Sequence, residues 1–121
     1  MKETRVVDYV MDFLVSKGSD SIFVLTGNGS MYINDAIAKT KKLKYYTVRH
    51  ETAAPMMAES YSRLTGKLGV VCVTAGPGAT NTVSGLAEAW VDSGAVMVLS
   101  GQSPRKQIPK NSIRSFGTAG F

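Results

Sequence analysis

Apolar residues follow two different spacings along this chain, one typical of helices and one typical of buried strands. From Val6 to Leu14 the apolar side chains recur every three or four residues, which predicts an amphipathic helix. Thr4 precedes this pattern as a candidate N-cap, and Gly18 follows it as a left-handed stop. Further helices are expected at residues 31–38, with Asn34 on the polar side, and at residues 52–64, with Gly66 as the stop. Another is expected from the turn at 76–78 to about residue 91.

Short, nearly continuous apolar runs separate the predicted helices. They predict strands at residues 22–25, 43–48, 69–73 and 95–99. The run at 69–73 is almost wholly apolar, which is typical of a strand covered on both faces. Strand and helix alternate, and right-handed crossovers between successive strands would give a parallel sheet. The predicted fold class is therefore α/β, with a Rossmann-like parallel sheet and helices on both faces.

Length and composition limit the possible classes of protein. The chain has 121 residues, enough for one small domain with a core but not for two. It is 44% hydrophobic and 19% charged, as is usual for a soluble protein, and it shows no secretory signal. No apolar run reaches the roughly 18–20 residues that span a bilayer, so we expect a cytoplasmic protein with no membrane partner. The final residue, Phe121, follows no terminating element, which indicates a chain cut inside a larger domain.

The formal charge of +5 raises the question of nucleic-acid binding. The main contributors are Lys39, Lys41, Lys42, Lys44, Arg105, Lys106, Lys110 and Arg114. No stacking aromatic residues or nucleic-acid module accompany these charges, and lysines near a helix C-terminus complement its dipole. We therefore expect no nucleic-acid partner, whereas a phosphorylated ligand or an acidic protein surface stays open.

Three predicted strand-to-helix turns carry the candidate chemistry, at residues 26–30, 49–52 and 74–81. Such turns gather at the carboxyl ends of parallel strands, where α/β sheets usually bind ligands. Two of the turns are rich in glycine, which allows the backbone to approach a ligand closely. The turn between them carries Glu51. Taken alone, a glutamate at a strand end is more often exposed or capping than catalytic, and each glycine turn alone is a weak signal.

The combination of motifs is more specific than any one of them. His50-Glu51, the Gly-Pro-Gly-Ala-Thr-Asn run at 76–81 and Ser-Gly-Gln at 100–102 together resemble the pyrimidine-binding domain of thiamine-diphosphate enzymes, in the acetolactate-synthase-like group. The resemblance covers nearly the whole chain. It implies that residues 1–121 are an N-terminal pyrimidine-binding domain, incomplete at its C-terminal end, and that the diphosphate-binding domain is absent. The whole enzyme would then be a transferase or lyase acting on a 2-keto acid.

The resemblance implies a catalytic role for Glu51. In the family this glutamate hydrogen-bonds the N1′ atom of the cofactor's aminopyrimidine and favours the imino tautomer, whose N4′ removes the proton from the thiazolium C2. The physics agrees, because a carboxyl group enclosed by apolar surroundings has a raised pKa and can hold the proton that N1′ must receive.

The family's other site positions carry over residue by residue. The cofactor-binding positions are Gly27, Asn28, Gly29, Glu51, Thr74, Pro77, Gly78 and Asn81. Gln102 follows the fourth strand and is expected near the substrate, with His50 as a second candidate. Neighbouring residues in an extended chain point to opposite sides, so His50 faces away if Glu51 faces the ligand. Many family members have Phe-Gln-Glu where residues 115–120 read Ser-Phe-Gly-Thr-Ala-Gly, which leaves the keto acid undecided.

The resemblance also implies what lies outside this chain. The expected cofactors are thiamine diphosphate and Mg²⁺, with the metal and diphosphate held by a second domain; no metal ligand is assigned here and FAD is undecided. Because the family's active site forms between subunits, we expect a homodimer or homotetramer in which another subunit supplies the diphosphate-binding domain. The isolated chain should be inactive.

Several alternatives stay open at this point. The chain is a fragment of a longer enzyme, a naturally split subunit, or a domain that has lost its partner, and the abrupt ending favours a fragment. A non-catalytic dimerising module of the same fold is a second hypothesis, although an intact Glu51 and Gly-Pro-Gly turn argue against it. A flavodoxin-like phosphate binder would fit the fold but leave the Arg-His-Glu pattern at 49–51 unexplained.

Overall fold

The computed structural model describes residues 3–104 of the chain. The basic residues from Arg105 to Arg114 and the segment 115–120 lie outside the described residues. The strands are β1 (Ser21–Val24), β2 (Lys44–Thr47), β3 (Gly69–Val73) and β4 (Val96–Ser100). The helices are α1 (Val6–Ser16), the short 3-10 turn η1 (Asn28–Ser30), α2 (Met31–Lys39), α3 (Ala53–Thr65), α4 (Pro77–Thr80) and α5 (Val83–Val91).

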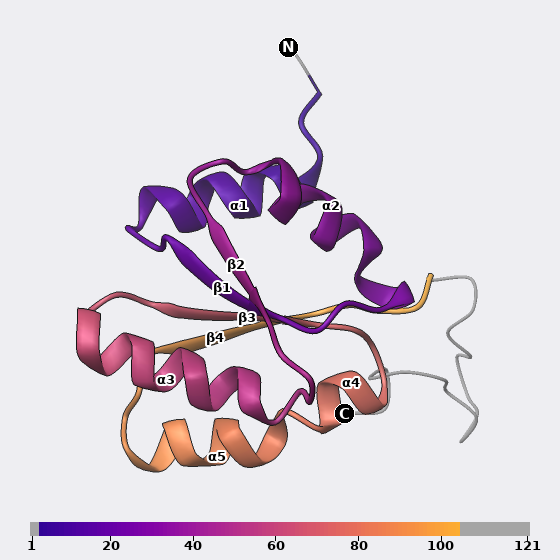
Figure 1. Cartoon of the computed structure of the whole chain (residues 1–121). Coiled ribbons are helices and arrows are strands. Elements are labelled where there is room, and N and C mark those ends of the chain that lie inside the picture. The colour runs from indigo at the N-terminus through magenta and orange to yellow at the C-terminus, as the bar shows by residue number, and fades with distance from the viewer. Residues whose placement is uncertain (1–2, 105–121) are drawn as a thin grey trace.

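All four described strands are parallel and form one sheet in the order β2-β1-β3-β4. Helices α1 and α2 cover one face, and α3 with α5 outside it covers the other (Figure 1). The predicted α/β class is therefore confirmed, with the sheet in the middle of three layers. Among the described residues, no helix is long and apolar enough to cross a membrane.

The core has two halves, one on each face of the sheet. On the α1–α2 side, Met11, Leu14 and Ile37 pack against Ile22 and Val70. On the α3 side, Ala54 and Ala58 pack against Phe23, Val71 and Val73. All residues of β3 are buried, as its apolar pattern predicted, because this central strand has helices over both faces. Small residues on α3 let this helix lie close to the sheet and bring its first turn to the carboxyl ends of the strands.

Two predicted helix boundaries are wrong. Helix α1 starts after Arg5, not Thr4: Arg5 is extended, has no side-chain cap bond, and its guanidinium instead pairs with Asp8 in the first turn and with Asp35 on α2. The helix expected after the turn at 76–78 is divided into α4 and α5. At the division, the Thr82 hydroxyl donates to the Ala79 carbonyl at 2.6 Å, a local bond that competes with the regular helical ladder.

Both predicted glycine stops have positive φ angles. Gly18 has φ of 87°, and Gly66 has φ of 69° directly after α3. Only glycine adopts this left-handed conformation without strain, so these two positions determine where α1 and α3 end.

Candidate functional site

The three predicted turns meet at the carboxyl end of the sheet. They follow β1, β2 and β3 and lead into η1, α3 and α4 respectively (Figure 1). Glu51 lies in the middle turn, where the Ala54 amide donates to its carbonyl at 3.1 Å and so begins the first turn of α3. Its side chain is therefore held at the start of a helix that packs on the sheet.

The Glu51 carboxylate is half-buried and lies against the start of α4. The Asn81 side-chain amide donates a hydrogen bond to Oε2 at 3.0 Å. The other oxygen, Oε1, faces Gly78: a Cβ added to that glycine would lie 3.5 Å from it. One carboxylate oxygen is thus held by Asn81, and the second is directed at the glycine turn.

Gly78 lies between Glu51 and Thr74. A Cβ at position 78 would come within 2.7 Å of Thr74 Cγ2, a distance that allows no side chain without a shift. Thr74 in turn accepts a hydrogen bond from the Gly29 amide at 3.0 Å, and a Cβ on Gly27 would lie 2.5 Å from Thr74 Cβ. The two glycine turns are consequently joined through Thr74.

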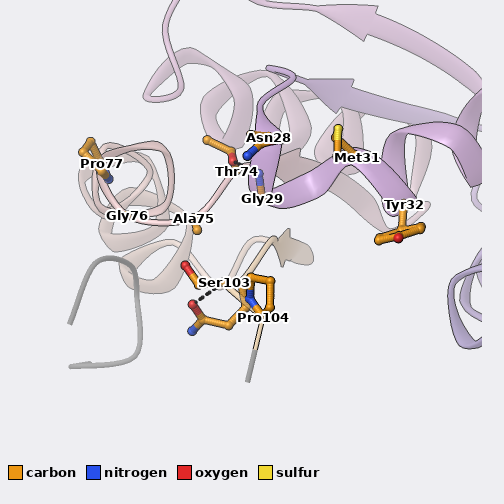
Figure 2. Close-up of a pocket in the computed structure, with 11 residues that line it drawn as sticks. Asn28, Gly29, Met31, Tyr32, Thr74, Ala75, Gly76, Pro77, Ser103 and Pro104 are labelled. Atoms are coloured by element: carbon orange, nitrogen blue, oxygen red, sulfur yellow. Dashed lines mark hydrogen bonds between the residues drawn. The ribbon is translucent and has the colours of Figure 1, made fainter. Parts of the chain in front are cut away.

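A pocket of about 570 Å³ opens beside these turns (Figure 2). Its lining includes the predicted site residues Asn28, Gly29, Thr74, Pro77 and Gln102. Glu51, Gly78 and Asn81 do not line it, because residues 74–77 form its wall and Gly78, the next residue, faces the carboxylate. The sequence predicted one pocket that holds both the carboxylate and the 27–30 loop, whereas in the described residues the turn at 74–78 lies between them.

His50 does not point into this pocket. Its side chain is exposed, and its Nδ1 atom accepts a hydrogen bond from the backbone amide of Thr52 at 3.2 Å. An extended chain predicts His50 and Glu51 on different sides. In the structure, Glu51 contacts the α4 turn, and His50 forms its hydrogen bond within its own turn. The structure thus gives the imidazole a local contact in the 50–52 turn.

Three features of the site were not predicted from the sequence. The Thr52 hydroxyl donates to the Asn81 carbonyl at 2.7 Å. Gly101 lies so close to the first turn that a Cβ would come within 2.3 Å of the Gly29 carbonyl oxygen. The Ser-Gly-Gln motif at 100–102 includes Gly101, but the motif alone does not predict which residues this glycine contacts.

The third feature is a series of side-chain hydrogen bonds beneath the turn at residues 26–30. Asn34, expected on the polar side of α2, faces inward and donates to Ser30 at 3.2 Å. Ser30 donates to the Gly27 carbonyl at 3.1 Å, and the buried Cys72 thiol donates to the Asn34 side chain at 3.6 Å. Burial raises the pKa of Cys72 to about 12, so its thiol stays protonated and available as the donor. These bonds support the turn that lines the pocket.

The fold and the site together define an α/β ligand-binding domain with a glycine-rich turn and a carboxylate at the carboxyl ends of its strands. Residues 4–118 match the family described as "Thiamine pyrophosphate enzyme, N-terminal TPP binding domain". The match covers more than half of the chain, and the chain belongs to this family.

Several proteins named acetolactate synthase are similar to this chain. It is 44% identical over 95 residues, 78% of its length, to the acetolactate synthase large subunit of Buchnera aphidicola subsp. Schizaphis graminum (strain Sg), of which the matched part is 17%. It is 37% identical over 120 residues, 99% of its length, to the large subunit of Lactococcus lactis subsp. lactis (strain IL1403), where the match covers 21%. The chloroplastic acetolactate synthase of Arabidopsis thaliana is 39% identical over 107 residues, 88% of this chain and 16% of the relative. The chain therefore spans about a fifth or less of the length of these relatives.

Proposed function

We propose that this chain is the pyrimidine-binding half of a thiamine-diphosphate-dependent lyase or synthase that acts on a 2-keto acid, in the manner of acetolactate synthase. The observation that carries the proposal is the contact among Glu51, Asn81 and Gly78. It unites the carboxylate and the glycine turn that the sequence separates by almost 30 residues, in a chain that belongs to the thiamine pyrophosphate family.

The chemistry of Glu51 supports a site for the aminopyrimidine end of thiamine diphosphate. Gly78 carries no side chain that would clash with Thr74, so its turn can lie directly against the Glu51 carboxylate. Glu51 offers Oε1 on that side, while Asn81 occupies Oε2. A carboxyl group can either donate to or accept from a ring nitrogen, and it can exchange a proton with it.

Glu51 is the residue to which we assign catalysis. When bound, thiamine diphosphate supplies a thiazolium carbon that adds to the carbonyl group of a keto acid. Glu51 would hydrogen-bond the cofactor's N1′ and exchange a proton with it reversibly, and Asn81 would keep the carboxylate from turning away. The backbone of residues 27–29 and 74–78 would line the cofactor, and Gln102 would face the substrate from the pocket wall.

The diphosphate and its Mg²⁺ are assigned to a domain outside this chain. Among residues 3–104, no three His, Cys, Asp or Glu side chains gather where they could hold a metal ion. Following the resemblance to the family, we propose that the diphosphate and Mg²⁺ are bound by the diphosphate-binding domain of another subunit.

A second copy of the chain is the expected partner. Helix α5 exposes Val83 (55%), Trp90 (86%) and Val91 (79%), an unusual amount of apolar surface for a helix facing water. This surface supports a homodimer or homotetramer, in which another subunit would complete the site and enclose the Glu51 side chain, which is only half-buried here.

Replacement of Glu51 by glutamine tests the proposal in the assembled enzyme that contains this chain. Glutamine keeps the size and the hydrogen bond but exchanges no proton. We expect the hydrogen at C2 of the bound cofactor to exchange with deuterated water about 10²–10⁴-fold more slowly, as is usual when a proton-transfer group is lost. Proton NMR of the quenched cofactor measures this rate.

Glu3 provides the matched control, because it is an exposed glutamate before α1 that belongs neither to the pocket lining nor to α5. Glu3→Gln should exchange at the wild-type rate. Near-normal exchange in Glu51→Gln, with cofactor bound, would remove the catalytic assignment of Glu51.

A further inference from the structure

We propose that Thr52 is a positioning residue, which acts through Asn81 to hold the Glu51 carboxylate in place. This inference rests on the proposed function and deepens it, because it assigns a role to a side chain that contributes no atom to the proton transfer. It starts from the pattern of hydrogen bonds between two turns that lie far apart in the sequence.

The two turns are joined by a reciprocal pair of hydrogen bonds. Asn81 donates through its side-chain amide to Glu51 Oε2 at 3.0 Å. The backbone carbonyl of the same Asn81 accepts from the Thr52 hydroxyl at 2.7 Å. Asn81 is therefore held at two points: Glu51 accepts from its side chain, and Thr52 donates to its backbone. A single bond would allow Asn81 to rotate about it, whereas two bonds determine the direction of its amide.

Thr52 is itself held firmly enough to serve as the fixed point. It is half-buried, and its backbone amide donates to His50 Nδ1 at 3.2 Å. Its carbonyl oxygen lies where a Cβ on Gly85 would come within 3.0 Å, so the absence of a side chain at position 85 lets α5 approach this turn. Pro55 lies against the same glycine, with 2.5 Å between its Cγ and the Cβ position. The start of α3 and the start of α5 are thus in close contact around Thr52.

The Asn81 carbonyl lies at the division between α4 and α5, where the helical ladder is interrupted. A carbonyl at such a point gains most from a side-chain donor, since helix ends leave backbone groups without an intrahelical partner. Removal of the Thr52 hydroxyl would free the end of α4, and with it the amide that occupies Glu51 Oε2. The carboxylate could then turn Oε1 away from Gly78. A displacement of about 1 Å in a catalytic group can cost on the order of 10²-fold in rate.

The test compares Thr52→Val with Thr52→Ser in the assembled enzyme that contains this chain. Valine keeps the branched shape and lacks the donor, whereas serine keeps the donor and lacks a methyl group. We expect T52V to slow C2 hydrogen exchange about 10–100-fold and T52S to stay within about threefold of wild type. Crystal structures of the cofactor-free T52V variant should show the Asn81 amide more than 3.5 Å from the Glu51 carboxylate, beyond hydrogen-bond distance.

Thr65→Val is the matched control. Thr65 ends the same helix, and its hydroxyl also donates to a backbone carbonyl, that of Tyr61 at 2.7 Å, but at the far end of α3 from the site. T65V should exchange at the wild-type rate, with a similar change in melting temperature to T52V. If T52V does not fold, T52A replaces it as the variant without the hydroxyl.

The outcomes separate the two proposals. The positioning role of Thr52 is wrong if E51Q slows exchange while T52V exchanges at the same rate as T65V. It is also wrong if E51Q and T52V both slow exchange but the Asn81–Glu51 hydrogen bond is intact in T52V. In either case the proposed function stands. If E51Q itself exchanges normally, the proposed function fails first. Loss of rate and loss of the Asn81–Glu51 bond in T52V, with both retained in T52S, support the inference.

Discussion

Asp20 precedes β1 at the end of the sheet opposite the candidate site, and its carboxylate gathers partners from three parts of the chain. The Tyr61 hydroxyl donates to it at 2.6 Å, the Ser21 hydroxyl at 2.9 Å, and Lys67 forms an ion pair with it. The Lys67 ammonium, followed by the two hydroxyls, holds the pKa of Asp20 well below its usual value. This one residue joins the start of β1 to the end of α3 and to the loop before β3.

These contacts predict a pH-dependent stability. A lowered native pKa means that the stabilisation is present above the ordinary pKa of about 3.9 and is lost as the pH falls through the native value. Because the Asp20 side chain is 48% exposed, solvent screening limits the effect to at most about 1 kcal/mol. Asp20→Asn should therefore lower the free energy of unfolding by that amount at pH 7, and the difference should shrink below about pH 4.

Urea denaturation at several pH values measures this difference. Asp12→Asn is the control, since Asp12 is an exposed residue of α1 that takes no part in the Asp20 contacts. A loss of stability for Asp20→Asn that is the same at pH 3 and pH 7 would contradict the role of the ionised carboxylate.

At the scale of elements, helix α3 runs from the candidate site to the opposite end of the sheet. It begins directly after the Glu51 turn and ends at Gly66, whose left-handed conformation turns the chain back toward β3. Three residues later Gly69 starts β3, and a Cβ there would lie 2.1 Å from the Ala58 carbonyl oxygen. The position of the helix over the sheet, and hence of Glu51 at its start, depends on this close approach.

The two glycines should respond differently to alanine. Gly66 has open space around its Cβ position and a positive φ, so G66A should cost about 1 kcal/mol through backbone strain alone. G69A forces α3 away from the sheet and should cost more, about 3 kcal/mol, at the upper end of the overpacking range. Guanidinium denaturation measures the free energy of unfolding of both variants. Equal losses of stability would show that α3 moves away from the sheet without an added energetic cost.

At the scale of the whole molecule, the candidate site lies at the surface of the part of the chain that the structure describes. The pocket lies at the surface beside the end of β4, and Glu51 is only half-buried. The chain also spans 16–21% of the length of the three relatives described above. In the proposed function, a partner domain that covers the carboxyl end of the sheet would both shield Glu51 and supply charged contacts to the diphosphate.

The proposed function predicts the behaviour of the 121-residue chain on its own. We expect it to bind thiamine diphosphate at least about 100-fold more weakly than the assembled enzyme, because two charge-assisted hydrogen bonds of about 1.5–3 kcal/mol each correspond to such a factor. It should decarboxylate no keto acid. Isothermal titration calorimetry and an assay with pyruvate check both points, and turnover by the purified chain would contradict the assignment of Mg²⁺ and diphosphate to another domain.

Much of the fold followed from local patterns. The unbroken apolar run of β3 predicted a strand between two helical layers, and the glycines at 18 and 66 predicted where helices stop, because burial and positive φ restrict residue type strongly. The start of α1 and the division between α4 and α5 were missed, since an ion pair of Arg5 and a hydroxyl of Thr82 decided them and neither leaves a clear local signal.

For the candidate site, the amino-acid sequence alone determined which loops meet, because parallel strands joined by helices place all their carboxyl ends at one edge. It also singled out Glu51 and the glycine turn at 76–78. Only the tertiary structure decided that Asn81 holds one oxygen of that carboxylate, that Thr52 holds Asn81, and that Asn34 faces inward beneath the first turn. Such contacts depend on the distance between helices α3 and α5 and between α2 and the sheet, which packing sets to fractions of an ångström and which no pattern along the chain records.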